Sequence, residues 1–416
     1  MTRAFVARAH LILGIHSRAM LKALRILLAI AALALCVCSV LPEIQTGAWW
    51  VRGFDFPRAQ AAAFIVLVLL GQGVVGWLAH RQRKKNASAP QRASVFKRAI
   101  IPALLVGALA WQCFRILPYT PVFPVQMEAA RGEPGETLCL LVYNVRYDNT
   151  KIDALLETVR KADPDVVLLA EPTRWWHDRL APLAEAYPHA ILQPQDNHYG
   201  MLLYSRHPLI APEVRFLVED GVPSMLTTLQ LPSGREVRLY GVHPKPPGLK
   251  RPIDSEREDS HQRDAELLMI AREVKDARDA GDATPVIVAG DFNDVAWSHT
   301  TRLFQRVSGL LDPRVGRGFY NSFHARRRIY RFPIDHVFAS DHFRLVSLQV
   351  LPDIGSDHHP VLATLALEPT APLTQDEPDP QGDDLEEAEE TIREGKEEVR
   401  EDELVEERTP SSEPRG

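Results

Sequence analysis

Three long apolar segments in the first 117 residues constrain the fold of this chain more than any other feature of its sequence. They cover residues 21–41, 61–79 and 100–117, and each approaches the ~20 apolar residues that cross a bilayer as a helix. A cleaved signal peptide would account for the first segment alone, but the basic stretch before it is long and two more segments follow. We therefore expect residues 1–117 to form a membrane anchor with three transmembrane helices.

Basic residues are distributed unevenly around these segments. The stretch before the first segment and the loop between the second and third are rich in Lys and Arg. The loop between the first and second has little net charge and carries Trp49, Trp50 and Phe54, which suit a membrane interface. Because basic loops stay in the cytoplasm, everything after Leu117 is expected outside it. For a bacterium, this predicts a multi-pass protein of the inner (plasma) membrane whose globular domain is extracytoplasmic.

The remaining chain divides by composition into three parts. Residues 118–136 are rich in Pro and Gly and are typical of a linker, whereas residues 137–367 alternate strand-like and helical patterns. Residues 368–416 are acidic and lack aromatic side chains, so we expect a disordered tail, with at most a transient helix over 383–408. Many strands and few long helices predict an α/β sandwich of two sheets with helices outside.

Polar side chains stand at the ends of apolar runs throughout residues 137–367. Since such runs indicate buried strands, the polar groups are expected to share one mouth at the strand ends. Carboxylates, amides and imidazoles gathered in this way can build a site for a metal and a phosphate. The residues are Asn144, Glu171, His243, Asp291, Asn293, Asp335, Asp357 and His358.

The residues that end the first strands and the GDFN motif have both a chemical and a structural interpretation. Glu171 and Asn144 offer hard oxygen ligands that suit Mg²⁺, although Glu171 could instead cap the next helix. Asp291 could orient or deprotonate a water and Asn293 could donate to a phosphate oxygen, but Gly, Asp and Asn are also turn residues.

The histidines form the second group of candidates. His358 could act on the attacking water or stabilise charge, and Asp357 could orient it or reach a metal. His359 is the alternative imidazole, although it should point the other way in an extended segment. Asp335 could hold one histidine in its useful tautomer. His243 would stabilise the phosphoryl oxygens or protonate the leaving oxygen, but a lone strand-end histidine is commonly structural.

The order of these residues along the chain resembles the endonuclease/exonuclease/phosphatase family. This superfamily includes pancreatic-type deoxyribonuclease, exonuclease III-like endonucleases, inositol polyphosphate 5-phosphatases and neutral sphingomyelinases. The resemblance covers residues 137–367 and implies a four-layer, deoxyribonuclease I-like α/β sandwich. It also implies in-line attack of water on a phosphoester, helped by Mg²⁺ or Mn²⁺. By the same resemblance Asn144 and Glu171 are similar to the family's metal ligands, and Asp357–His358 match its terminal pair. We expect metal ligation by Asn144, Glu171 and Asp357, and catalytic roles for His243, Asp291, Asn293, Asp335 and His358.

One departure from the family pattern bears on the reaction. Exonuclease III-like members carry Tyr and Asn near the histidine position, whereas this chain reads GVHPKPPG around His243. A role in repair of abasic sites is therefore not expected.

The substrate is less constrained than the reaction. A formal net charge of −6 gives no general attraction for nucleic acid, and the four cysteines suggest neither a zinc site nor disulfides. Arg326, Arg327, Arg328 and Arg331 could bind a substrate phosphate or be solvated loop charge. A nuclease, a phospholipid or sphingomyelin phosphodiesterase and an inositol-type phosphatase all stay open, as does a catalytically idle, membrane-tethered binding module.

Overall fold

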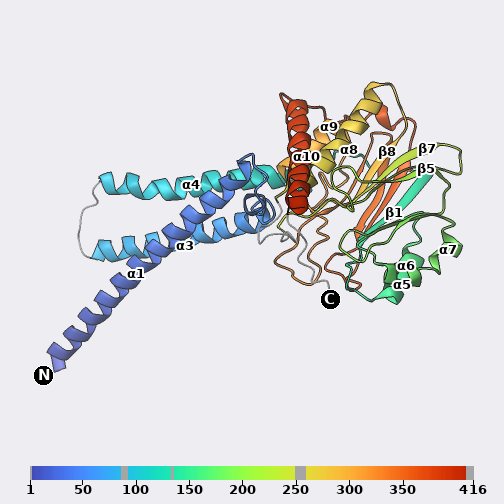
Figure 1. Ribbon diagram of the computed structural model, residues 1–416. Coiled ribbons are helices and arrows are strands. Elements are labelled where there is room, and N and C mark those ends of the chain that lie inside the picture. The colour runs from blue at the N-terminus through green and yellow to red at the C-terminus, as the bar shows by residue number, and fades with distance from the viewer. Residues whose placement is uncertain (1, 86–91, 133–134, 249–258, 409–416) are drawn as a thin grey trace. The chain divides into compact units, whose positions relative to one another are not determined.

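The computed structural model describes residues 2–85, 92–132, 135–248 and 259–408 (Figure 1). The chain forms two compact units. The anchor unit comprises residues 1–45 and 57–117, and the globular unit comprises residues 46–56 and 118–416. The loop between the first two apolar segments thus belongs to the globular unit and not, as the sequence suggested, to the anchor.

The anchor unit consists of three long helices, α1 (Thr2–Val40), α3 (Arg58–Lys85) and α4 (Arg92–Ile116). Their segments Ala19–Glu43, Arg58–Gln82 and Ala99–Tyr119 are long and apolar enough to cross a membrane. The helices meet through the buried residues Ala32, Ile65 and Leu105. Leucine, isoleucine and valine side chains cover much of the outer surface, as expected for helices that face lipid. The prediction of three such helices is confirmed.

The globular unit contains two β-sheets. The first has the strand order β10-β11-β1-β2-β4-β3 and the second β5-β6-β7-β8-β9. Figure 1 labels β1 of the first sheet and β5, β7 and β8 of the second. The first sheet contains β1 (Glu136–Asn144), β2 (Val166–Ala170), β3 (His189–Gln193), β4 (Met201–Ser205), β10 (Phe343–Val350) and β11 (Val361–Leu367). The second contains β5 (Leu209–Arg215), β6 (Ser224–Gln230), β7 (Glu236–Val242), β8 (Val286–Asp291) and β9 (Asp335–Ala339).

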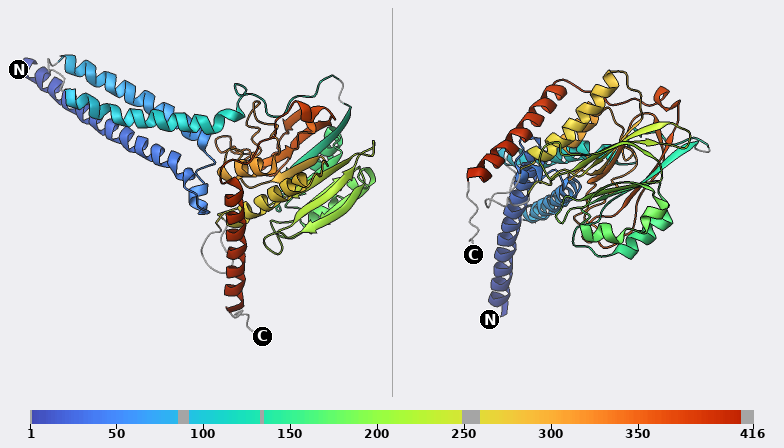
Figure 2. Two further views of the ribbon diagram at one scale, coloured as in Figure 1. Left: turned by 90° about the horizontal axis from the view of Figure 1, so that it is seen from above. Right: turned by 45° about the vertical axis from the view of Figure 1, so that its right-hand side comes forward.

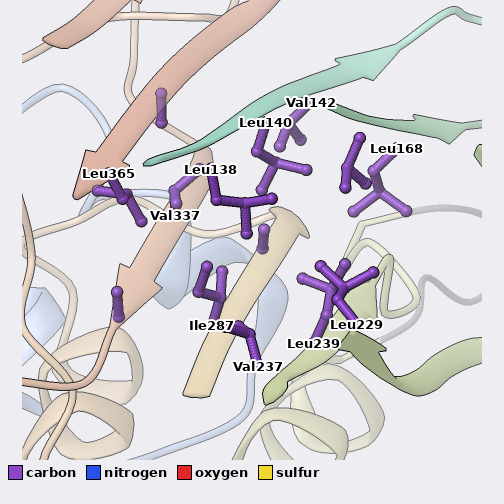
Figure 3. Packing of buried hydrophobic residues seen from close by; sticks show 14 of the residues in the cluster. Leu138, Leu140, Val142, Leu168, Leu229, Val237, Leu239, Ile287, Val337 and Leu365 are labelled. Atoms are coloured by element: carbon purple, nitrogen blue, oxygen red, sulfur yellow. The ribbon is translucent and has the colours of Figure 1, made fainter. Parts of the chain in front are cut away.

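The two sheets pack face to face over an apolar core (Figure 3). Alternate residues of β1 show why: Leu138, Leu140 and Val142 enter this core, whereas Leu141 and Tyr143 point to the opposite face. Helices α5 (Ile152–Ala162), α6 (Arg174–Arg179) and α7 (Leu183–Ala186) cover that opposite face. Helices α8 (His261–Asp279) and α9 (His299–Ser308) cover the second sheet. The predicted four-layer α/β sandwich is confirmed.

The acidic tail contains a helix, α10 (Asp384–Arg408), which lies alongside α8 (Figure 2). Leu385, Ala388 and Ile392 form a narrow apolar stripe that packs on the core beneath α8 and α9. Arg306 pairs with Asp384 at 2.7 Å, and Arg272 pairs with Glu389 at 3.2 Å. The prediction of a disordered tail is therefore wrong for Asp384–Arg408, because the average composition hid a stripe of apolar residues at helical spacing. Residues 409–416 lie outside the described part of the chain.

Residues 46–56, which include the short helix α2 (Trp49–Arg52), dock on the globular unit and are called the docked loop below. The Trp49 amide donates to Asp259 Oδ1 at 3.0 Å, and the Ser260 amide donates to the Gly47 carbonyl at 2.8 Å. The Trp297 indole donates to the Asp55 carbonyl at 2.7 Å. The loop is thus held by hydrogen bonds and is part of the domain that carries the candidate site.

The predicted linker is also packed rather than extended. Tyr119 donates from its hydroxyl to the Ala296 carbonyl at 2.5 Å, and Met127 is fully buried in the core between the sheets. Residues 133 and 134 lie outside the described residues. Three short 3₁₀ turns complete the elements: Leu41–Glu43, Leu117–Tyr119 and Ala371–Leu373.

Candidate active site

The strand-end residues predicted from the sequence come together at one end of the sandwich. Strands β1 and β2 are parallel, as are β7 and β8, so Asn144 and Glu171 share one edge and His243 and Asp291 share another. Strand β9 runs antiparallel to β8 with Asp335 opposite Asp291, which places Asp335 at the same end. Two sheets with these polar ends facing each other create the candidate site.

Asn144 joins the two sheets. Its side-chain amide donates to Glu171 Oε1 at 2.9 Å and to Asp291 Oδ2 at 3.0 Å. Its oxygen accepts from the Arg146 amide at 2.9 Å, so in this orientation it does not face the site. Direct metal ligation by Asn144, as expected from the sequence, would require the amide to turn over.

Glu171 is ionised at the mouth of the site. Burial alone would raise its pKa, but His198, His243 and Asn144 outweigh burial and lower the pKa to about 2. The His198 ring lies 3.6 Å from Glu171 Oε2, and the Tyr147 amide donates to the same oxygen at 3.2 Å. A carboxylate that keeps its charge in a largely buried position is suited to hold a cation.

His358 and Asp335 form a hydrogen-bonded pair. His358 Nδ1 lies 2.8 Å from Asp335 Oδ2, and because a carboxylate only accepts, Nδ1 is the donor. His358 Nε2 faces the site, 3.5 Å from Asp291 Oδ2. Burial would lower the pKa of His358, but the two carboxylates outweigh it and raise that pKa. Burial and the neighbouring Asp335 raise the pKa of Asp291, so Asp291 and His358 compete for a proton.

His243 has an unusual environment for a buried histidine. The side chain is 1% exposed, lies 3.9 Å from Asp291 Oδ2, and neither ring nitrogen has a hydrogen-bond partner among the described residues. Burial lowers its pKa to about 4, so the ring is neutral at neutral pH. A structural histidine would normally have at least one bonded nitrogen, so the ring is available for a ligand of the site.

The turn after β8 positions Asn293. Its amide donates to Asp291 Oδ1 at 2.9 Å, and its side chain donates to the Pro244 carbonyl at 3.0 Å. Gly290 is required here, since a Cβ atom would lie 1.9 Å from the Val242 carbonyl oxygen. The turn therefore connects the ends of β7 and β8, whereas donation from Asn293 to a phosphate oxygen stays a prediction.

A buried ion cluster connects this turn to the docked loop. Arg263 donates to the Asn293 carbonyl at 2.9 Å and pairs with Asp264 at 2.7 Å. Arg52 and Asp55 of the docked loop are also buried. Arg52 helps to lower the pKa of Asp264, after the opposing effect of burial and the larger effect of Arg263. A charge of the docked loop thus acts on Asp264, which pairs with the Arg263 side chain that holds the turn after β8.

The two remaining sequence candidates are the neighbours of His358 in the sequence: Asp357 precedes His358 and His359 follows it. Asp357 is half-buried and accepts from the Ser356 hydroxyl at 3.3 Å, so its role as a metal ligand stays a prediction. His359 Nδ1 lies 2.9 Å from the Leu351 carbonyl. Its partner differs from that of His358, as expected for neighbours that point in opposite directions.

The residues fit a divalent cation. Asp291, Asp335 and His358 each offer a ligand atom within 4.8 Å of the others. His358 Nδ1 and Asp335 Oδ2 are hydrogen-bonded to each other, whereas His358 Nε2 faces Asp291. Asp335 Oδ1 and both nitrogens of His243 are buried and lack partners in the described part of the chain. Oxygen and imidazole donors of this kind suit divalent metals.

The predicted phosphate-binding arginines lie on a hairpin beside His358. Arg327 and Arg328 are exposed, and Arg331 donates to the Ala325 carbonyl at 2.9 Å. Two further residues of the site, His198 and Arg146, were not predicted from the sequence. Both lie in loops without periodic pattern, and Arg146 has a left-handed φ of 60°.

The sequence matches the model of the Endonuclease/Exonuclease/phosphatase family over residues 141–358. Among solved structures it is similar to the catalytic domain of human Nocturnin with bound sulfate, at 17% identity and TM-score 0.44, covering 55% of this chain and 94% of that one. It is also similar to an endonuclease/exonuclease/phosphatase from Bacteroides vulgatus, at 18% identity and TM-score 0.44. That similarity covers 56% of this chain and 100% of the Bacteroides chain. Truncated Caenorhabditis elegans TDP2 has the same identity, TM-score and coverage. No curated protein matches the chain.

Proposed function

Because the chain belongs to the endonuclease/exonuclease/phosphatase family, we propose that it is a membrane-tethered hydrolase that cleaves a phosphodiester or phosphomonoester by in-line attack of water. Enzymes of this family are phosphoesterases that depend on a divalent metal. Magnesium is the proposed ion, with manganese as a substitute, since the donors are mainly oxygens.

One observation carries the proposal. A chain of polar contacts runs from Glu171 through Asn144 to Asp291, and from there to His358 and Asp335. The chain of contacts thus connects residues at the strand ends of both sheets. A phosphate placed over it would meet a cation site at one end and a proton-carrying imidazole at the other.

Each group then has a definable task. Asp291 would orient the attacking water and accept its proton, and His358, held by Asp335, would direct positive charge at the phosphoryl oxygens. His243 would donate a hydrogen bond to a phosphoryl oxygen or the leaving oxygen. Glu171, with Asn144 and Asp357, would hold the metal ion. A bound ion of this kind offsets the charge that develops on the phosphoryl oxygens.

The proposed location is the inner (plasma) membrane, with the globular unit outside the cytoplasm. The basic loops of the sequence support this orientation. The docked loop supports the number of crossings but not their direction: it connects the first two candidate spans and is hydrogen-bonded to the globular unit, as three crossings require in either orientation. A phosphatase-reporter fusion after Leu117 should be active, and an inactive fusion would refute the orientation.

The full chain in lipid nanodiscs provides the test of activity. We expect Mg²⁺-dependent hydrolysis of bis-(p-nitrophenyl) phosphate that is lost in Glu171→Gln and His358→Ala. His359→Gln is the matched control, because it changes the neighbouring imidazole outside the site. Absence of turnover with any divalent metal would favour the binding module over the enzyme.

A further inference from the structure

A hairpin formed by Phe323–Phe332, called the rim hairpin below, adjoins the candidate active site. The Phe323 amide donates to the Phe332 carbonyl at 3.0 Å, and the Ala325 amide donates to the Asp357 carbonyl at 2.7 Å. The Phe323 and His358 ring centroids lie 5.0 Å apart. The base of the hairpin is thus part of the wall around His358, and its tip extends from the edge of the site.

The tip combines positive charge with exposed apolar surface. Arg326, Arg327 and Arg328 are exposed, and they are followed by Ile329 and Tyr330, which are 70% and 59% exposed. Arginine beside an exposed aliphatic and an exposed tyrosine suits a lipid headgroup layer, where phosphates bind the cations and the boundary region accepts the apolar groups. A nucleic acid would bind the arginines and could stack on tyrosine, but it would not bury isoleucine.

The chain itself brings the hairpin close to a candidate membrane span. The Phe332 ring packs against the Phe56 ring of the docked loop, with centroids 5.4 Å apart. Phe56 precedes Arg58, the first residue of the second candidate span, by two residues, which limits their Cα separation to about 7 Å. Tyr119, the last residue of the third candidate span, bonds to Ala296 in the loop that follows Asn293. Within the globular unit, the rim hairpin therefore packs on a residue that is two positions before the second candidate span, and the loop after Asn293 contacts the last residue of the third.

We propose that the rim hairpin binds the anionic headgroup layer of the bilayer, and that the substrate is a phosphate ester displayed by a membrane lipid. Ile329 and Tyr330 enter the interface, and Arg327 and Arg328 bind lipid phosphates. The inference rests on the proposed phosphoesterase function and narrows its substrate class.

The test compares two substrates for the full chain in nanodiscs. One is a phospholipid with its headgroup phosphodiester in the disc, and the other is soluble bis-(p-nitrophenyl) phosphate with the same metal. The measured quantity is the ratio of the two kcat/KM values. We expect Ile329→Ser/Tyr330→Ser to lower this ratio about tenfold, because the apolar contacts hold the mouth at the interface. Leu192→Ser, which changes an exposed leucine on β3, is the control and should leave the ratio unchanged.

The role of Arg327 and Arg328 is tested by a second measurement, the dependence of lipid hydrolysis on anionic lipid. Adding phosphatidylserine to phosphatidylcholine nanodiscs should raise lipid hydrolysis by the wild-type chain. Arg327→Gln/Arg328→Gln should lower that enhancement about fivefold or more, since each arginine near an anionic surface contributes to binding. Arg160→Gln, at an exposed arginine of α5, is the matched control.

The outcomes separate the two proposals. If the wild-type chain hydrolyses neither substrate, the proposed function fails. If it hydrolyses the soluble diester but the hairpin variants leave the ratio and the phosphatidylserine effect unchanged, only the lipid proposal is overturned. Preferential cleavage of plasmid DNA that falls with the arginine variants would likewise overturn it in favour of a nuclease.

Discussion

The candidate site has a mouth half, with Glu171, and a buried half, with Asp291, Asp335 and His358, and the two halves differ in burial and charge. Glu171, from the first sheet, lies at the mouth with a side chain 15% exposed and keeps its charge. Asp291, which ends β8 of the second sheet, and His358, which precedes β11 of the first, are almost completely buried. Their side chains lie 3.5 Å apart, so a proton can be shared between them. The difference suggests a division of work, with the mouth half holding a cation and the buried half moving protons.

The largest expected effect is in the buried half. Asp291→Asn keeps the shape and the bond from the Asn144 amide but cannot accept a proton, so kcat should fall about 10³- to 10⁴-fold. The Mg²⁺ concentration for half-maximal activity should change little. Steady-state kinetics over a range of Mg²⁺ concentrations measures both quantities. A large shift in the Mg²⁺ requirement would show that the two halves do not divide the work in this way.

Glu171→Gln is the corresponding change in the mouth half. It removes the charge that would hold the cation, so activity at low Mg²⁺ should fall about 10³-fold. High Mg²⁺ should restore part of the activity, which it should not do for Asp291→Asn. Calorimetric titration of Mg²⁺ gives the affinity directly. An unchanged affinity would contradict the assignment of Glu171.

Asp335→Asn tests a positioning residue of the buried half. The amide can present either oxygen or nitrogen to His358 Nδ1, so the ring loses its fixed tautomer and part of its positive charge. We expect a loss of about 10- to 100-fold in kcat with KM nearly unchanged. The dependence of kcat on pH provides a second measurement, because a folding defect would lower kcat without changing the pH at which it falls. With one carboxylate removed, the pKa of His358 should fall, and the alkaline limb of the profile should move to lower pH.

The substitution Arg52→Gln tests whether the activity of the buried half depends on the docked loop. The variant removes a buried charge near Asp264, which in turn binds Arg263 behind the catalytic turn. We expect a several-fold lower kcat and a lower melting temperature, with the Mg²⁺ requirement preserved. A melting temperature and kcat equal to those of the wild type would show that the loop does not support the turn.

Substitution of Glu266, a buried carboxylate that is not part of the site, should have the smallest effect on activity. It is a carboxylate of α8 outside the site, and burial raises its pKa to about 8. Because this pKa exceeds that of the unfolded chain, ionisation destabilises the fold increasingly as pH rises from about 4.5 to 8. Glu266→Gln should therefore add on the order of 5 kcal/mol of stability above pH 8 and little at pH 4. Melting curves at the two pH values measure the difference in stability between the variant and the wild type. A variant that is more stable than the wild type only at acidic pH would contradict the raised pKa of Glu266.

The sequence was sufficient for the fold and for the core of the site. Apolar runs defined the strands that carry Asn144, Glu171 and Asp291, and parallel pairing brings such strand ends together. The runs could not reveal His198 or Arg146, because loop residues are positioned by tertiary contacts that leave no periodic pattern. Nor could they show the packing of residues 46–56 and 384–408, since both segments are stabilised by surfaces formed elsewhere in the chain.

The central claim is that both halves of the site act on a phosphate around one cation. An anomalous difference map from crystals of the full chain grown with Mn²⁺ tests it most directly. We expect one peak in the site, bound by Glu171 and facing His358 across the space for a phosphate. A map with no peak there, or with an ion bound only by Asp335 and His358 while Glu171 stays uncoordinated, would contradict the account.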